Sequence, residues 1–188
     1  MEKIYQYYKQ TFNISDHDWD IFSSKLIQQD FKKKAQILKK GETEKYLSFI
    51  EAGIVRFYIP KIEYDTTINL AFEGSFASVY DSFLTQSPSA YACEAITDTT
   101  LWRLAYDELQ NIYSETTIGN LIGRKAAEQL YLLIKQRELS FLNKSAEERY
   151  LDLFETRPDL IKHIPLKYIA SYIGVTPQAL SRIRRRIT

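Results

Sequence analysis

The sequence has very few of the residues that build disulfides and metal centres. Its 188 residues include one cysteine, Cys93, so a single chain cannot form a disulfide, an iron–sulfur cluster or a cysteine-based zinc site. The only histidines are His17 and His163, which disfavours a histidine-rich metal centre. We therefore expect no metal cofactor, and the lone cysteine fits a protein of the reducing cytoplasm.

Long apolar runs and low-complexity segments are also missing. No run approaches the roughly 18 apolar residues that a membrane-crossing helix needs, and the N-terminus lacks the apolar core of a signal peptide. With 6 glycines and 5 prolines, collagen-like and low-complexity structures are excluded. We expect no membrane partner and one large or two small globular domains.

The net charge of +1 conceals an uneven distribution. Segment 160–188 has no acidic residue and six basic ones, namely Lys162, Lys167, Arg182, Arg184, Arg185 and Arg186. Subtracting these six from the 25 basic residues leaves 19 against 24 acidic residues in the rest of the chain. A basic end on an acidic body indicates a polyanionic partner at that end, with a solvated charged tail as the alternative.

Hydrophobic periodicity predicts an α+β fold. Residues 1–30 have helical spacing, with Ser15 as a candidate cap. Between about 31 and 104 the pattern changes to short runs of β-branched and aromatic residues separated by turns. The expected strands are 36–39, 46–51, 54–59, 66–72, 91–96 and 100–104. Strands of this number and spacing predict an antiparallel sandwich or barrel.

From Tyr106 onward the pattern is helical again, and a long helix carries an apolar stripe at i, i+3, i+4 spacing. Its members are Ile118, Leu121, Ile122, Ala126, Leu130, Leu133, Ile134 and Phe141. Such a stripe needs a surface that buries it, either the barrel or the same helix of a second subunit. We expect a homodimer built on this helix. A further helix, 145–155, begins with a capping box at Ser145.

Residues 166–186 have the pattern of a helix-turn-helix. Ala170 is small where two helices must approach, and Gly174 lies where the turn needs a left-handed backbone. Thr176 is a good N-cap and Pro177 a good first helical residue. The shared apolar contact is expected from Ile169, Ile173, Val175, Leu180 and Ile183.

The faces of the second of these helices predict separate roles. One face, at i, i+3, i+4, i+7 spacing, consists of Gln178, Ser181, Arg182 and Arg185. Gln pairs with adenine and Arg with guanine in the major groove, so we expect this face to read bases. Phosphate contacts are expected from Lys167, Thr176, Arg184 and Arg186, with Pro177 beside them. The alternative for the arginines is a frayed basic terminus that contacts phosphates only.

Taken together, the predicted strands, the long helix and the terminal helix-turn-helix resemble the Crp/Fnr family of bacterial transcription regulators. The resemblance covers nearly the whole chain. Residues 37–42 and 46–58 resemble the start of that family's cyclic-nucleotide-binding-type β-roll, 72–76 its next turn and 99–104 its closing strand. The resemblance implies a sensor β-roll over 1–115, a dimerisation helix over 116–142 and a DNA-binding domain over 143–188. It implies no enzyme and no bound cofactor. The implied partners are double-stranded DNA with an inverted repeat, a second copy of the chain and RNA polymerase.

Two departures from the family pattern modify this expectation. Nucleotide-binding members carry a Glu and an Arg in the phosphate-binding segment, where this chain has Val79 and Pro88. Without the Arg a cyclic phosphate loses its bidentate partner, so cyclic AMP and cyclic GMP are disfavoured and the effector, if any, is another small molecule. The candidate pocket residues are Gly74, Ser75, Phe76, Ser78, Val79, Tyr80, Ser89, Ala90 and Tyr91. The chain also stops at Thr188, so the family's two-stranded wing is expected to be missing.

The sequence bears on three other interpretations. A cupin-type metal enzyme is disfavoured because both histidines fall outside the strand region. Cys93 with Glu94 suits a redox or haem ligand in the resembled family, or a small apolar residue on a strand. Finally, the helix-turn-helix of a ligand-binding β-roll module can dock protein instead of DNA.

Overall fold

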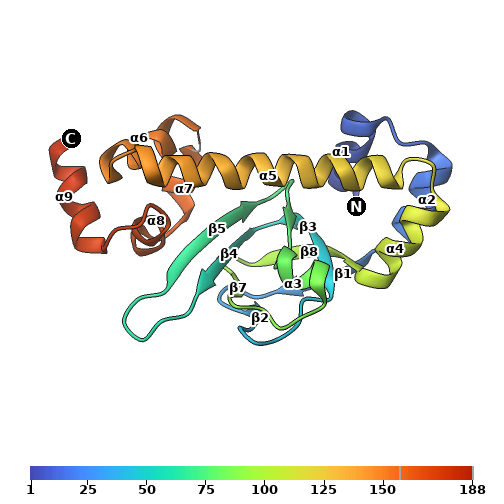
Figure 1. The fold of residues 1–188 in the computed structure, drawn as a ribbon, viewed down its shortest axis with the longest axis horizontal. Coiled ribbons are helices and arrows are strands. Elements are labelled where there is room, and N and C mark those ends of the chain that lie inside the picture. Colours follow the sequence, from blue (N-terminus) through green and yellow to red (C-terminus); the bar gives the residue numbers. More distant parts are fainter. Residues whose placement is uncertain (157, 188) are drawn as a thin grey trace.

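The computed structural model describes residues 1–156 and 158–187. At its centre are two four-stranded antiparallel sheets, ordered β1-β8-β3-β6 and β2-β7-β4-β5, with helices on either side (Figure 1). The strands are β1 Ile27–Phe31, β2 Gln36–Leu38, β3 Tyr46–Ala52, β4 Ile54–Ile59, β5 Thr66–Phe72, β6 Phe76–Ala77, β7 Ala92–Ala95 and β8 Thr99–Ala105.

The helices precede the first strand, interrupt the strands once at α3 and follow the last strand. They are α1 Glu2–Phe12, α2 Asp16–Ser24, α3 Tyr80–Thr85, α4 Tyr106–Glu115, α5 Gly119–Asn143, α6 Ala146–Thr156, α7 Pro158–His163, α8 Leu166–Tyr172 and α9 Pro177–Ile187. No helix among residues 1–156 and 158–187 is long and apolar enough to cross a membrane. The α+β architecture predicted from the periodicity is confirmed.

Six predicted strands are present within one or two residues of their expected bounds. The helical prediction for residues 1–30 is wrong at its end, because Ile27–Phe31 is strand β1. This strand pairs with β8 from Ile27 opposite Arg103 to Phe31 opposite Thr99. Pairing with a strand some 70 residues away decided the conformation of a segment whose own sequence, Ile-Gln-Gln-Asp-Phe, has little strand propensity.

Three apolar clusters hold the molecule together. One fills the β-roll and includes Ile50, Val55 and Leu101. A second is aromatic and packs α1, α2 and α4 against the sheet of β3 and β8. The third is shared by the outer face of the β4–β5–β7 sheet and helices α6, α8 and α9. The β-roll and the C-terminal helices are therefore joined by one core.

The helix starts follow the expected capping chemistry. The Ser15 hydroxyl accepts a hydrogen bond from the Asp18 N–H at 3.1 Å. At α6 the Ser145 hydroxyl accepts from the Glu148 N–H at 3.2 Å, and the Glu148 carboxylate accepts from the Ser145 N–H at 2.7 Å. Both orphan donors are thus satisfied, as the capping-box pattern predicts.

Candidate nucleic-acid interface

Helices α8 and α9 form the expected helix-turn-helix. Gly174 has φ of +80°, and a Cβ there would lie 2.7 Å from the Phe141 ring. Both the backbone conformation and the space therefore favour glycine. The Thr176 hydroxyl accepts a hydrogen bond from the Ala179 N–H at 3.2 Å, which caps the start of α9.

The inner faces of the two helices are closely packed. Ile169 and Ala170 on α8 are fully buried, and Leu180 and Ile183 on α9 lie against them in the same cluster. This contact fixes which side of α9 turns outward.

The outward side of α9 carries the predicted base-reading residues. Gln178, Arg182 and Arg185 are exposed. Ser181 is exposed as well, but its hydroxyl donates to the carbonyl of Pro177 at 3.0 Å and so turns back onto its own helix. The structure thus brings one amide and two guanidinium groups together on a single exposed face.

The residues predicted to contact phosphate differ in their surroundings. The Lys167 Nζ lies 5.0 Å from the centroid of the Tyr168 ring, at the exposed start of α8. Arg184 and Arg186 are both exposed, and Arg186 forms an ion pair with Glu147 of α6 at 3.2 Å. A DNA phosphate therefore has to displace Glu147 from Arg186, and exposed pairs of this kind are weak.

Helix α5 lies along one side of the β-roll and reaches the C-terminal helices (Figure 1). Its first turns pack on the chain itself, because Ile118 and Ile122 join the aromatic cluster of α1, α2 and α4. Further along, large apolar residues are exposed. Leu121, Leu133 and Ile134 belong to the predicted stripe, whereas the stripe omitted four others, Tyr131, Leu132, Leu139 and Leu142. Ala126 is exposed and Leu130 half-buried. The β-roll therefore does not cover this helix.

The predicted effector-pocket residues do not converge. Val79 is buried and packs inside the β-roll with Tyr91 nearby, whereas Phe76 and Tyr80 pack against the cluster of the N-terminal helices. Gly74 and Ala90 are exposed. The segment has strand β6 followed by helix α3, neither of which was predicted, and these direct successive side chains to opposite sides.

The polar groups of this segment are satisfied within the chain. The Ser78 hydroxyl donates to the carbonyl of Tyr46 at 3.0 Å. The Ser89 hydroxyl donates to the carbonyl of Tyr91 at 2.7 Å, and that of Ser75 donates to the carbonyl of Phe72 at 2.5 Å. A phosphate entering here has to replace these bonds.

A buried carboxylate that the sequence analysis did not identify lies beside the same segment. Glu44 accepts hydrogen bonds from the N–H groups of Tyr46 at 3.0 Å and Val79 at 3.4 Å. It also lies 3.6 Å from the guanidinium of Arg103, which is itself buried. Burial raises the pKa of Glu44 and lowers the pKa of Arg103. Arg103, the one charged residue of strand β8 Thr99–Ala105, was the available signal.

Cys93 lies inside the β-roll and is almost fully buried. Burial, with Glu44 nearby, raises the pKa of its thiol well above the usual range. A thiol held in its protonated form is a poor nucleophile and a poor metal ligand. The geometry therefore favours Cys93 as a packed apolar residue over a redox or haem ligand.

Comparison with known proteins gives the domain and the fold. The cyclic nucleotide-binding domain family matches residues 28–116. None of the curated proteins compared with this sequence is a significant match.

Solved structures match over most of the chain. A CooA mutant from Carboxydothermus hydrogenoformans is 18% identical, with a TM-score of 0.73, and the match covers 95% of this chain and 82% of that one. A Crp/Fnr-family regulator from Eubacterium rectale has 18% identity and a TM-score of 0.71 over 97% and 87% of the two chains. FixK2 from Bradyrhizobium japonicum has 18% identity and a TM-score of 0.73 over 86% and 84%. Residues 28–116 thus match the cyclic nucleotide-binding domain family, and the chain has the fold of the Crp/Fnr transcription regulators.

Proposed function

We propose that this protein is a homodimeric transcription regulator that binds DNA in a sequence-specific manner and reads it with α9. The observation that carries the proposal is the outward face of α9. It presents Gln178, Arg182 and Arg185 on a helix-turn-helix, within a segment that has no acidic residue after position 159. A recognition helix of this kind enters the major groove, where amide and guanidinium groups pair with base edges.

The dimer supplies the specificity that one helix-turn-helix lacks. The exposed apolar side chains of α5 provide the surface for a second copy of the chain. A twofold dimer sets two recognition helices about 34 Å apart on one side of the duplex and therefore prefers an inverted repeat. Contact with RNA polymerase stays a prediction from the family resemblance.

Arg182→Ala should lose roughly 1–3 kcal/mol of binding free energy on the preferred site and relax discrimination at one position per half-site. Lys167→Ala should weaken binding to all sequences alike and reduce the salt dependence, because a phosphate contact releases counterions without reading bases. Titrations of both variants on specific and random duplexes at two salt concentrations measure these effects. Lys40→Ala, which removes an exposed lysine from the sensor, is the control.

The outcome also separates DNA binding from protein docking. If Arg182→Ala weakens every duplex equally, the assignment of Arg182 to base reading is wrong. If the wild type binds no duplex and its terminal arginines instead hold an acidic partner protein, DNA will not compete for that partner.

Cyclic AMP and cyclic GMP should not bind tightly. Val79 and Pro88 stand where nucleotide-binding relatives of the resembled family have Glu and Arg, and the Val79 N–H already points to the Glu44 carboxylate. A phosphate approaching that N–H meets a second negative charge. Calorimetry with both cyclic nucleotides, and with 5′-AMP as the control, is the test. Micromolar affinity for either cyclic nucleotide contradicts this prediction.

A further inference from the structure

The helix-turn-helix of α8 and α9 is not attached through α5 alone, because it also packs on the β-roll. Ile54, Leu70 and Ile96 on the outer face of the β4–β5–β7 sheet are buried in one cluster with Ile169 and Ile173 of α8. The first helix of the helix-turn-helix therefore packs directly on the sheet. Its orientation, and through it that of α9, is set by what this face of the sensor presents.

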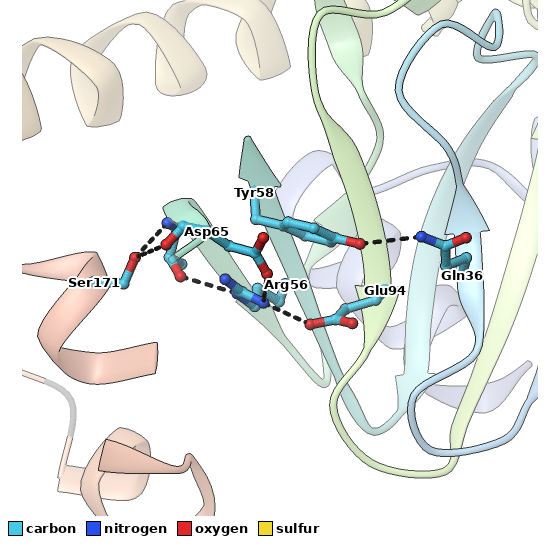
Figure 2. A network of polar contacts seen from close by, with 7 residues as sticks. Gln36, Arg56, Tyr58, Asp65, Glu94 and Ser171 are labelled. Atoms are coloured by element: carbon cyan, nitrogen blue, oxygen red, sulfur yellow. Dashed lines mark hydrogen bonds and ion pairs between the residues drawn. The ribbon is translucent and has the colours of Figure 1, made fainter. Parts of the chain in front are cut away.

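Arg56 of β4 lies at the centre of the docking face (Figure 2) and is 1% exposed. Its Nη1 donates to Glu94 at 2.8 Å and to Asp65 at 3.3 Å, and its Nε donates to the Thr67 hydroxyl at 2.9 Å. All these acceptors belong to the sensor. The sensor alone thus fixes the plane of the guanidinium.

Two tyrosine rings pack against the guanidinium. The guanidinium carbon lies 4.4 Å from the ring centroid of Tyr58, which belongs to the same strand, and 4.0 Å from that of Tyr168 on α8. The Tyr58 hydroxyl is held in turn by the Gln36 amide at 3.1 Å (Figure 2). The stack joins the sensor to the helix-turn-helix through Tyr168, next to the predicted phosphate contact Lys167.

A second tie lies one turn further along α8. The Ser171 hydroxyl donates to the carbonyl of Asp65 at 2.7 Å and accepts from the N–H of Thr67 at 2.7 Å (Figure 2). From α5, Arg137 donates to the carbonyl of Tyr172 at 2.9 Å. Three successive contacts therefore fix α8 along its length.

Docking leaves the reading face open. Gln178, Arg182 and Arg185 are exposed while α8 lies on the sheet. Undocking, in contrast, uncovers the apolar side chains of Ile54, Leu70 and Ile96. The docked arrangement is therefore compatible with binding to DNA.

We infer that Arg56 is a positioning residue for DNA recognition, which holds α8, and so α9, in the DNA-reading orientation through its stack on Tyr168. The inference rests on the proposed function. An inverted repeat requires two reading helices at a fixed separation and angle, and freedom at either docking face reduces the probability that both half-sites are engaged together. Binding to random DNA depends on charge and needs no such alignment.

Tyr168→Leu removes the ring but keeps an apolar side chain. Tyr168→Phe is the comparison variant, because it keeps the ring and loses only the hydroxyl, whose side-chain hydrogen-bond partner is Glu94. In the full-length protein Tyr168→Leu should lower the affinity for the selected inverted repeat about tenfold and change the affinity for a random duplex less than about twofold. Arg56→Lys keeps the charge but not the planar guanidinium. It should therefore also lower the ratio of the affinity for the inverted repeat to the affinity for a random duplex. Ser171→Ala, which removes the second tie without touching the ring, should lower the ratio in the same direction.

Hydrogen exchange provides a measurement that needs no DNA. The Thr67 N–H belongs to the sensor, but its acceptor is the Ser171 hydroxyl of α8. Its protection therefore reports docking directly and should fall in Tyr168→Leu and stay at the wild-type level in Tyr168→Phe.

The outcomes separate the inference from the proposed function. If the wild type selects an inverted repeat and Tyr168→Leu and Ser171→Ala bind it as well as the wild type does, the inference is overturned and the proposed function stands. If the wild type shows no sequence preference, the proposed function fails and the inference with it. Equal losses on specific and random duplexes also overturn the inference.

Discussion

Leu133→Glu should convert the protein to a monomer in sedimentation and lower its affinity for an inverted repeat about 100-fold or more. In the single chain Leu133 is 57% exposed, next to Ile134 at 58%, so the substitution leaves the folded chain nearly undisturbed. In a dimer built on α5 the same position becomes buried, and a carboxylate there is costly. A monomer contacts one half-site and loses the avidity that links the two.

The control for this prediction is Leu84→Glu. Leu84 is 52% exposed and lies on α3, so it is not part of the exposed apolar face of α5. This variant should sediment and bind as the wild type does. A Leu133→Glu protein that remains dimeric, or a wild type that is monomeric at working concentration, shows that α5 is not the dimer interface.

Ile169→Ala should reduce the free energy of unfolding by about 2–5 kcal/mol, because it deletes buried methyl groups from a fully packed position. Since the cluster around Ile169 includes Ile54, Leu70 and Ile96 of the sheet, sensor and helix-turn-helix should unfold together. Trp19 and Trp102 both belong to the sensor, so their fluorescence reports the sensor, while circular dichroism reports the helices. The two signals should change at one denaturant concentration.

The matched control is Ile27→Ala, since Ile27 is largely exposed on β1. It should change the free energy of unfolding by less than about 0.5 kcal/mol if β1 is only an edge strand. Two separate transitions in the wild type, or an Ile169→Ala effect no larger than that of the control, contradict the shared core.

The sequence predicted the features whose signals are local. Glycine turns separate the strands of the β-roll, and Gly174, Thr176 and Pro177 mark the turn and start of α9 within a few residues of one another. The helix-turn-helix was also predictable because its two helices are adjacent in sequence. The fold class therefore followed from periodicity and turn chemistry alone.

What the sequence did not predict depends on contacts between distant segments. Strand β1 exists because β8 pairs with it, and α3 is a short helix with no side-chain cap at Val79. The predicted effector residues come from two short stretches, 74–80 and 89–91, that the resemblance implies. The local backbone sends their side chains to opposite sides, which periodicity did not indicate.

The docking face was missed for the same reason. In the sequence Arg56 is 38 positions from Glu94 and 112 positions from Tyr168. Only the sheet and the fold of the C-terminal helices bring the three residues together. The signal available was an arginine inside the apolar strand Ile54–Ile59. A buried guanidinium requires partners, so such a residue is a reason to look for a polar network.

Selection of bound duplexes from a random DNA pool by the wild-type protein tests the central claim most directly. The account predicts enrichment of an inverted repeat whose half-sites are centred about 34 Å apart, one turn of the duplex. It also predicts that the selected duplex binds at least about 1,000-fold more tightly than bulk DNA. This factor is roughly the lower end of the ratio of specific to non-specific affinity among sequence-specific regulators. A pool with no enriched repeat, together with equal affinity for all duplexes, would contradict it.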